Sequence, residues 1–287
     1  MTKIDVFIKT SFFENACEQE RMSVFTVASQ KGGTGKTTTA AAIATWAHKQ
    51  GQKSLAIDLD PQGSLTLILR GDGNGLGAYD LMKGTPAAQI IQKDRAGLPD
   101  IIPASLQLAG ADAEYSQQPG RDFLLKKALE PITGRYDVIV IDTPPTLGTL
   151  LINALTASNE VIIPVQADTF AMQSVYQLSD TIEQVKQYCN PSLTVAGVLL
   201  TRHSGRTVLA RDLRENLEDK CSALGIKLFK TAIREGVAVK EAQTVRQSLF
   251  DYAPKSKPAQ DYKAFMEELS IGAVSYTHLR AHETSAH

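Results

Sequence analysis

The sequence contains little cysteine, no long apolar run and no excess of either charge. Its three cysteines lie far apart and none belongs to a C-x-x-C pair, which excludes a disulfide framework and a thiolate metal cluster. No apolar segment reaches the roughly 20 residues that a membrane-spanning helix needs. The N-terminus carries acidic residues and lacks the apolar core of a secretion signal. We therefore expect a cytoplasmic protein.

The charges are nearly balanced. The 30 Lys and Arg residues against 31 Asp and Glu give a formal net charge of −1, which argues against a basic coat over the whole surface. A local basic patch stays compatible with this balance. With 43 % hydrophobic and 21 % charged residues in 287 positions, the chain can form a large core.

Short β-branched runs alternate with longer helical patterns along most of the chain. This alternation predicts an α/β fold, with a mostly parallel twisted sheet flanked by helices. The strands are apolar throughout, as strands covered on both faces are. We expect strands at 23–29, 53–60, 136–145, 159–167 and 192–202, and helices at 37–51, 106–116, 120–130, 146–157, 170–189, 206–223 and 256–269. Residues 71–100, with scattered glycine and proline, predict a loop-rich excursion over the surface.

We expect a single domain at residues 22–272, because the chain contains no internal repeat and no long linker. Met22 begins the first strand-like run and is a candidate for the native start, with residues 1–21 as an extension ahead of it. Residues 273–287 show no apolar periodicity and resemble translated vector sequence. We expect them to be a non-native tail.

The segment ASQKGGTGKTTTA, residues 28–40, follows the first predicted strand. Its glycines let the backbone turn tightly with the N–H groups inward, and the next helix begins there, so the segment forms an anion site. Lys36 is placed to reach the β- and γ-phosphates of a nucleotide, and Thr37 to put its hydroxyl on Mg²⁺. The loop departs from the G-x-x-x-x-G-K-[ST] pattern, with Gln30 at the first glycine and a second lysine, Lys31. The expected nucleotide-binding residues are Lys31, Gly32, Gly33, Thr34, Gly35, Lys36, Thr37 and Thr38.

Acidic residues end two of the predicted strands. Asp142 ends the apolar run of VIVIDTPP, where a Walker-B acid beside the Mg²⁺ site is found. Asp58 and Asp60 stand at i and i+2 in AIDLDPQGS. One of these two can hold a metal-bound water or fix the loop, and the other can orient the attacking water for in-line displacement. The plainer alternatives are a strand-end cap and solvated strand-end acids. The expected metal ligands are Thr37, Asp142 and Asp58.

The segments KGGTGKTTT, DLDPQGS and VIVIDTPP together resemble the deviant-Walker ATPases of the ParA/MinD group, and most closely the ParA (Soj-like) partition proteins. The resemblance continues through VIIPVQA, GVLLTR and SLFDYAPKSKPAQDYKAFMEEL, and covers residues 22–270. It implies a P-loop NTPase fold, ATP and Mg²⁺ as cofactors, and a weak ATPase activity stimulated by DNA and a partner. It also implies a homodimer that forms with ATP.

The resemblance assigns a role to the second lysine. In that family the first lysine of the loop reaches across the dimer to the nucleotide of the partner, and Lys31 holds this position. The other implied roles are the in-cis phosphate lysine (Lys36), the Mg²⁺ ligand (Thr37), the water-activating acid (Asp60), the Walker-B acid (Asp142) and a supporting acid (Asp58). The expected catalytic residues are Lys31, Lys36 and Asp60.

Residues 202–246 hold ten Lys and Arg against six Asp and Glu. Such an excess commonly marks a solvated face. The resemblance implies instead that basic residues here bind nucleoid DNA without sequence preference, through its phosphates. The candidates are Arg206, Arg234, Lys240 and Arg246, although AIREGVAVKEAQ departs from the IPRNVRLSEAP pattern common in the family. A ParB-like protein is the implied partner, and partitioning of a plasmid or chromosome the implied function.

Other branches of the group carry features that this chain lacks. The last predicted helix, PAQDYKAFMEELSIG, is acidic on balance, so we expect no membrane recruitment of the MinD kind. No cysteine stands at a strand end near Asp142, as an iron–sulfur relative needs. The 21 residues before Met22 are too few for a helix-turn-helix region. Ligase chemistry on the same fold needs a substrate domain, for which the length leaves no room. Two alternatives stay open: a ParA-like positioner of chemoreceptors, a microcompartment or cellulose-synthesis machinery, and a non-hydrolysing regulator that senses nucleotide.

Overall fold

The computed structural model describes residues 22–271, except 94, 96, 116, 167, 169, 170 and 204–207. The predicted extension at 1–21 and the predicted tail at 273–287 lie outside the described residues, so both stay predictions. Six parallel strands form one sheet in the order β3-β2-β4-β1-β5-β6. The strands are β1 (Ser23–Val27), β2 (Ser54–Asp58), β3 (Asp100–Ile102), β4 (Val138–Asp142), β5 (Glu160–Gln166) and β6 (Thr194–Thr201).

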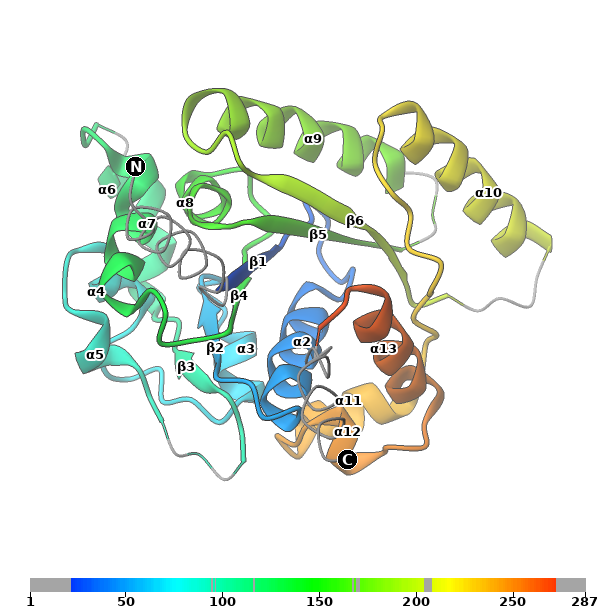
Figure 1. The fold of residues 1–287 in the computed structure, drawn as a ribbon, viewed down its shortest axis with the longest axis horizontal. Helices are drawn as coiled ribbons and strands as arrows, with labels where there is room; N and C mark the ends of the chain where they lie inside the picture. Colours follow the sequence, from blue (N-terminus) through cyan, green and yellow to red (C-terminus); the bar gives the residue numbers. More distant parts are fainter. Residues whose placement is uncertain are drawn as a thin grey trace, which may run out of the picture.

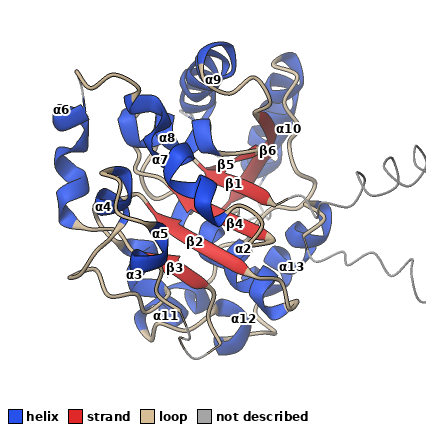
Figure 2. Cartoon of the chain, turned by 60° about the vertical axis from the view of Figure 1, so that its left-hand side comes forward, coloured by secondary structure: helices blue, strands red, loops and turns tan. Residues whose placement is uncertain are grey.

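Helices cover both faces of the sheet (Figures 1 and 2). In Figure 1, α8 and α9 lie above the strands, and α2 and α13 lie below them. The longer helices are α2 (Lys36–Lys49), α8 (Thr149–Ala157), α9 (Ala171–Tyr188), α10 (Val208–Ala223), α11 (Val237–Thr244) and α13 (Lys257–Glu268). The shorter ones are α3 (Ser64–Ile68), α4 (Ala78–Met82), α5 (Ala87–Ile90), η1 (Leu106–Gly110), α6 (Ala111–Tyr115), η2 (Arg121–Phe123), α7 (Leu124–Leu129), η3 (Glu130–Ile132) and α12 (Leu249–Tyr252).

The core has two layers because each strand alternates its side chains between the two faces of the sheet. Ile139 and Ile141 of β4 pack with α4 and α7 on one face. Val138 and Val140 of the same strand pack with α2 and α13 on the other. All five residues of β4 are buried, as expected for a parallel strand with helices on both sides.

The predicted α/β fold is confirmed, and each predicted strand and helix has a counterpart with shifted ends. The prediction for 71–100 was wrong in part. This segment contains α4 and α5 and ends at the edge strand β3. Leu81 and Ile90 are buried in the core, so the segment packs against the sheet. These helices have four or five residues, too few to display a helical period.

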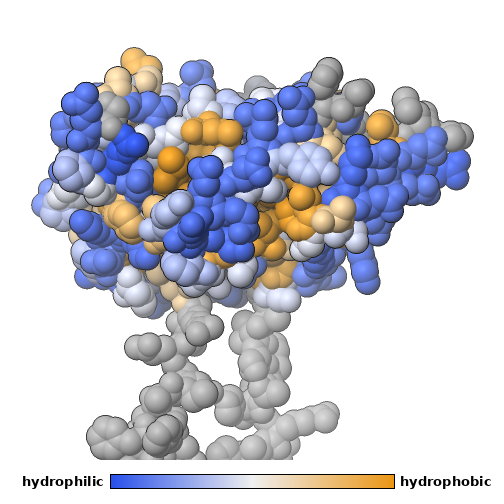
Figure 3. Space-filling view, turned by 90° about the horizontal axis from the view of Figure 1, so that it is seen from above, coloured by the Kyte–Doolittle hydropathy of each residue, from blue (hydrophilic) through white to orange (hydrophobic). Residues whose placement is uncertain are grey.

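The surface is largely hydrophilic. The face seen from above shows blue, hydrophilic area interrupted by several orange, hydrophobic patches (Figure 3). Within the described part of the chain, no helix is long and apolar enough to cross a membrane.

Candidate functional site

The carboxyl ends of β1, β2 and β4 meet at one edge of the sheet, because these three strands are parallel neighbours. Asp58 and Asp142 are register partners at the last positions of β2 and β4. The backbone N–H of Leu59 donates to the carbonyl of Asp142 at 3.0 Å, and the Thr143 hydroxyl donates to the carbonyl of Val27 at 3.0 Å. These bonds fix the three predicted acidic and glycine-rich segments against one another.

The glycine-rich loop connects β1 to α2. Gly33 and Gly35 have φ angles of 78° and 88°, a left-handed conformation that favours glycine. The Thr201 hydroxyl, at the end of β6, donates to the carbonyl of Thr34 at 2.7 Å and thereby holds the loop from the side. The Thr34 side chain is buried and donates back to the carbonyl of Lys31 at 3.3 Å. The loop therefore has its turn conformation fixed by the protein itself.

Lys36 is buried at the first position of α2, with 7 % of its surface exposed. Burial lowers the pKa of its ammonium, and the nearby carboxylates of Asp142 and Asp60 raise it in part. The ammonium also donates to the carbonyl of Lys31 at 3.4 Å. A buried cation beside two acids at the mouth of a glycine loop is positioned to meet the phosphates of a nucleotide.

Asp142 is fully buried, and neither of its carboxylate oxygens has a hydrogen-bond partner among the described residues. Burial raises the pKa of this carboxyl well above its ordinary value, and Asp58 raises it further. Thr37 and Lys36 offset part of the rise. Ionising a carboxyl in such surroundings is costly unless a cation balances it. The orphaned oxygens of Asp142 therefore fit a bound metal ion beside the Thr37 hydroxyl.

Asp58 differs from Asp142 in its hydrogen bonds, although both residues are fully buried. Its carboxylate accepts hydrogen bonds from the Thr66 backbone N–H and hydroxyl, both at 2.7 Å, and from the Asp60 backbone N–H at 3.1 Å. Burial raises the pKa of Asp58 to about 6, although these donors lower it. Of the two roles open to this acid, the contacts support fixing the loop between β2 and α3. The predicted metal role of Asp58 stays a prediction.

Asp60 is half-buried and lies in the turn after β2, where its carboxylate accepts from the Gln62 backbone N–H at 3.0 Å. It lies near enough to Lys36 to act on the pKa of that ammonium. Among the described residues, no group of three His, Cys, Asp or Glu side chains is placed to hold a metal. Mg²⁺ commonly takes one or two carboxylates together with phosphate oxygens and waters.

Two further loop residues have partners elsewhere in the fold. The ammonium of Lys31, at the exposed front of the loop, forms an ion pair with Asp168, after β5. The Thr38 hydroxyl accepts a hydrogen bond from the Gln243 side chain of α11 at 2.9 Å.

Arg202, the residue after β6, has a guanidinium nitrogen 4.0 Å from the point where a Cβ on Gly33 would lie. The sequence pattern indicated Arg202 only as one of ten basic residues in 202–246 and did not place it beside the loop.

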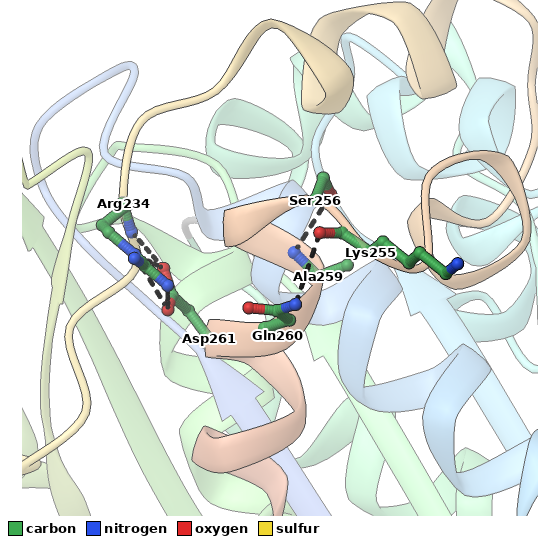
Figure 4. A network of polar contacts seen from close by, with 6 residues as sticks. All are labelled: Arg234, Lys255, Ser256, Ala259, Gln260 and Asp261. Carbon is green, nitrogen blue, oxygen red and sulfur yellow. Dashed lines mark hydrogen bonds and ion pairs between the residues drawn. The ribbon is translucent and has the colours of Figure 1, made fainter.

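The four candidate DNA-binding residues are placed differently. Arg206 lies outside the described residues. Arg234 forms a bidentate ion pair with Asp261 of α13, beside the Ser256 cap of that helix (Figure 4). Lys240 and Arg246 are exposed. The Arg246 carbonyl accepts a hydrogen bond from the exposed Arg70 side chain at 2.7 Å, which adds a basic residue that the sequence pattern did not indicate.

The fold and the site together define a P-loop nucleotide-binding protein. The family model described as AAA domain matches residues 22–195. The sporulation initiation inhibitor protein Soj of Bacillus subtilis is 36 % identical over 257 residues, which span 86 % of this chain and 98 % of that protein. The chain belongs to the ParA/Soj-type family of partition ATPases, within the ParA/MinD group.

Two solved structures are also similar. A plasmid partition protein from Borrelia burgdorferi bound to AMPPNP is 26 % identical, with a TM-score of 0.75, over 87 % of this chain and 99 % of that one. Cobyrinic acid a,c-diamide synthase from Mycobacterium smegmatis, with a bound ATP analogue and magnesium, is 34 % identical with a TM-score of 0.76. The match covers 87 % of this chain and 94 % of that one. The length of the chain therefore does not exclude ligase chemistry, in contrast to the prediction from the sequence.

Proposed function

We propose that the chain is an ATP-dependent dimerising ATPase that binds DNA non-specifically and drives plasmid or chromosome partitioning with a ParB-like partner. One observation carries this proposal: a single loop holds two lysines in different surroundings. Lys36 is buried beside Asp142 and Asp60, whereas the side chain of Lys31 is 40 % exposed at the front of the loop. One lysine serves the nucleotide of its own chain, and the other, which pairs with Asp168 in this structure, serves a second chain once that contact opens.

The substrate is ATP, bound by residues 31–38 with its phosphates at the backbone N–H groups of the loop and at Lys36. Thr37 and Asp142 would hold Mg²⁺, which when bound would supply positive charge against the phosphate oxygens. Asp60 orients the attacking water, and Asp58 keeps the Asp60 turn in place through the 3.1 Å backbone bond.

Lys31 couples the nucleotide to the dimer. A second cation at the γ-phosphate stabilises the charge of the transition state, and this cation comes from the partner chain. Hydrolysis removes the bridging charge, so nucleotide state and dimer state become linked. The Lys31→Ala variant should lose ATP-dependent dimerisation, measured by light scattering after size exclusion, and retain part of its nucleotide binding as a monomer. A normal ATP dimer from that variant would refute the trans role.

The ATP dimer holds DNA through exposed basic residues, in a cytoplasmic and nucleoid-associated protein. DNA retention should be strong with ATP, and weak with ADP or without nucleotide. Equal retention in all three states contradicts the proposed switch.

The basic residues can be tested separately from the fold. Lys240→Gln and Arg246→Gln should each reduce the slope of log DNA affinity against log salt concentration by about one in magnitude. Each variant removes one contact between a cation and a DNA phosphate. Arg234→Gln should instead lower the free energy of unfolding by about 1–2 kcal/mol, since it leaves the Asp261 carboxylate without its guanidinium.

The alternatives give different results in the same assays. A positioner of another cargo shows the ATP switch and DNA retention but no stimulation by a ParB-like protein encoded beside it. A nucleotide-sensing regulator releases no phosphate above background, with or without DNA and partner. The similarity to a diamide synthase makes ligase chemistry a third alternative. ATP consumption that requires glutamine and a carboxylic acid acceptor would favour this alternative.

A further inference from the structure

A hollow of about 500 Å³ lies at the amino-terminal edge of the sheet, opposite the phosphate-binding loop. Ser54 and Asp100, the first residues of β2 and β3, line it, together with Tyr136 just before β4. The loop after α2 contributes Gln52 and Lys53. We call this feature the amino-terminal hollow. Its volume lies in the range of small-molecule sites in proteins.

Positive charge dominates the lining. Lys53, Lys93 and Arg135 are exposed there, and His48 adds a titratable ring. Among the described residues of the lining, Asp100 is the one acid, and it accepts a hydrogen bond from the Tyr136 hydroxyl at 2.7 Å. The three permanent cations therefore outnumber the acid, and convergent cations in a concave site attract anions.

The negative groups next to the hollow are the C-terminal end of α2 and the carboxylate of Asp137. Gly51 donates to the carbonyl of His48 at 3.0 Å, and Gln52 donates to the carbonyl of Ala47 at 3.1 Å, so these two carbonyls have donors of their own. The carboxylate of Asp137 accepts from the backbone N–H of Lys53 at 2.7 Å and keeps its charge. A bound anion therefore depends on the three exposed cations of the lining, which outnumber Asp100 and Asp137 together.

A second observation concerns an acceptor inside the hollow. The side-chain oxygen of Gln52 is buried and has no hydrogen-bond partner in the described part of the chain. A buried unpartnered acceptor is costly and is satisfied by a donor from a ligand. Ile91, Ala88 and the buried ring of Tyr136 add an apolar wall. The lining therefore combines cations, one acceptor without a donor and apolar surface.

We infer that the amino-terminal hollow binds a small organic phosphate with a ring and an N–H or O–H donor, of the nucleoside monophosphate class. Its phosphate lies against Lys93 and Arg135, its donor meets the Gln52 oxygen, and its ring contacts Ile91 and Tyr136. The site is separate from the ATP site, because α2, with 14 residues and a length of about 21 Å, runs between them. A DNA backbone fits less well, since its phosphate edge offers acceptors and no donor for Gln52.

The test uses AMP as the probe and the full chain saturated with ADP and Mg²⁺, so that the phosphate-binding loop is filled. Isothermal titration should show AMP binding with a Kd at least about tenfold lower than that of inorganic phosphate. The double variant Lys93→Gln/Arg135→Gln should lose about tenfold or more in AMP affinity. Gln52→Leu should bring AMP affinity close to that of phosphate.

The control variant Lys126→Gln/Arg211→Gln removes the same two charges from exposed positions outside the hollow, and should bind AMP normally. Equal loss in both double variants would overturn the proposal, because it would indicate a general charge effect. Equal affinity for AMP and phosphate in the unchanged protein would also overturn it. So would a loss of DNA retention, without loss of AMP binding, in Lys93→Gln/Arg135→Gln.

Discussion

The ammonium of Lys31 and the carboxylate of Asp168 form an ion pair within one chain, between the phosphate-binding loop and the segment after β5. Both side chains are partly exposed, at 40 % and 27 %. A lysine that serves a partner chain must leave this contact first. Under the proposed role of Lys31, the ion pair would compete with dimerisation and favour the monomer.

Breaking this pair should favour the dimer. Asp168→Asn should lower the ATP concentration needed for dimerisation by about 1.4- to fivefold, since a partly exposed ion pair contributes roughly 0.2–1 kcal/mol. Analytical ultracentrifugation across an ATP series measures this shift. The matched control, Asp251→Asn, breaks the ion pair with Lys49 and should leave the series unchanged. In the Lys31→Ala background, which should not dimerise, Asp168→Asn should not restore the dimer, and a dimer restored there would contradict the competition.

Replacing Asp142 should weaken metal binding without destabilising the fold. Asp142→Asn should lose about tenfold or more of the Mg²⁺-dependent part of ATP affinity, because the metal loses an anionic ligand. Without nucleotide, the variant should unfold at the same temperature as the unchanged protein or higher, since it removes a buried carboxyl whose oxygens have no hydrogen-bond partner among the described residues. Thermal unfolding with ATP, in Mg²⁺ and in EDTA, measures both effects. A variant destabilised without nucleotide, or one with an unchanged response to Mg²⁺, would contradict the assignment.

Two neighbouring glycines should respond differently to the same substitution. Gly35→Ala forces a φ of 88° on a residue with a side chain, at a cost of about 1–2 kcal/mol, and should weaken ADP binding by about 5–30-fold. Gly32→Ala places its Cβ in open space without a positive φ, so it adds no backbone strain and should weaken ADP binding less than Gly35→Ala does. Titration with a fluorescent ADP analogue compares the two variants. Equal losses would mean that the loop is sensitive to any side chain.

Asp58 should make stability depend on pH. Its pKa rises from an ordinary value of 3.8 to about 6 in the folded protein, so folding favours the protonated form. The stabilisation is fully present below pH 3.8 and is lost as the pH rises through about 6. Relative to Asp58→Asn, the free energy of unfolding should therefore fall by about 3 kcal/mol between pH 3.8 and pH 7. Urea unfolding at several pH values measures this difference.

Thr66→Val is the matched control for the pH effect. It removes a hydroxyl donor from the same carboxylate, so it should raise the pKa of Asp58 and move the loss of stability to higher pH. The free energies of unfolding of the unchanged protein and of Asp58→Asn could instead differ by the same amount at every pH. That result would mean that Asp58 is not the group whose titration changes the stability.

The sequence predicted the sheet and the loop well because both depend on local patterns. Runs such as VIVID are apolar enough to indicate a strand buried on both faces, and glycines with Lys36 and Thr37 indicate a phosphate site. The edge strand β3 was missed because it has three residues between prolines and glycines. Its strand conformation depends on pairing with β2, which no local pattern records.

The contacts that distinguish similar residues could not be predicted, because they join distant parts of the chain. Asp58 and Asp142 both end apolar strands, yet only Asp58 has Thr66 as a donor. Lys31 and Asp168 stand 137 positions apart. The pairing of Arg234 with Asp261 likewise depends on how α13 packs, so a count of charges along the sequence does not reveal it.

The strand order also determines how firmly each part of the site is held. β1 and β4 have hydrogen-bonded neighbours on both sides, so their amide protons exchange with solvent only when the sheet opens as a whole. Asp142 ends one of these strands, whereas Lys31 and Asp168 lie in loops. Local opening can therefore rearrange the charged contact between the loops while the phosphate-binding end of the sheet stays closed. A cycle of nucleotide turnover then needs no global unfolding, and repeated turnover does not expose the core.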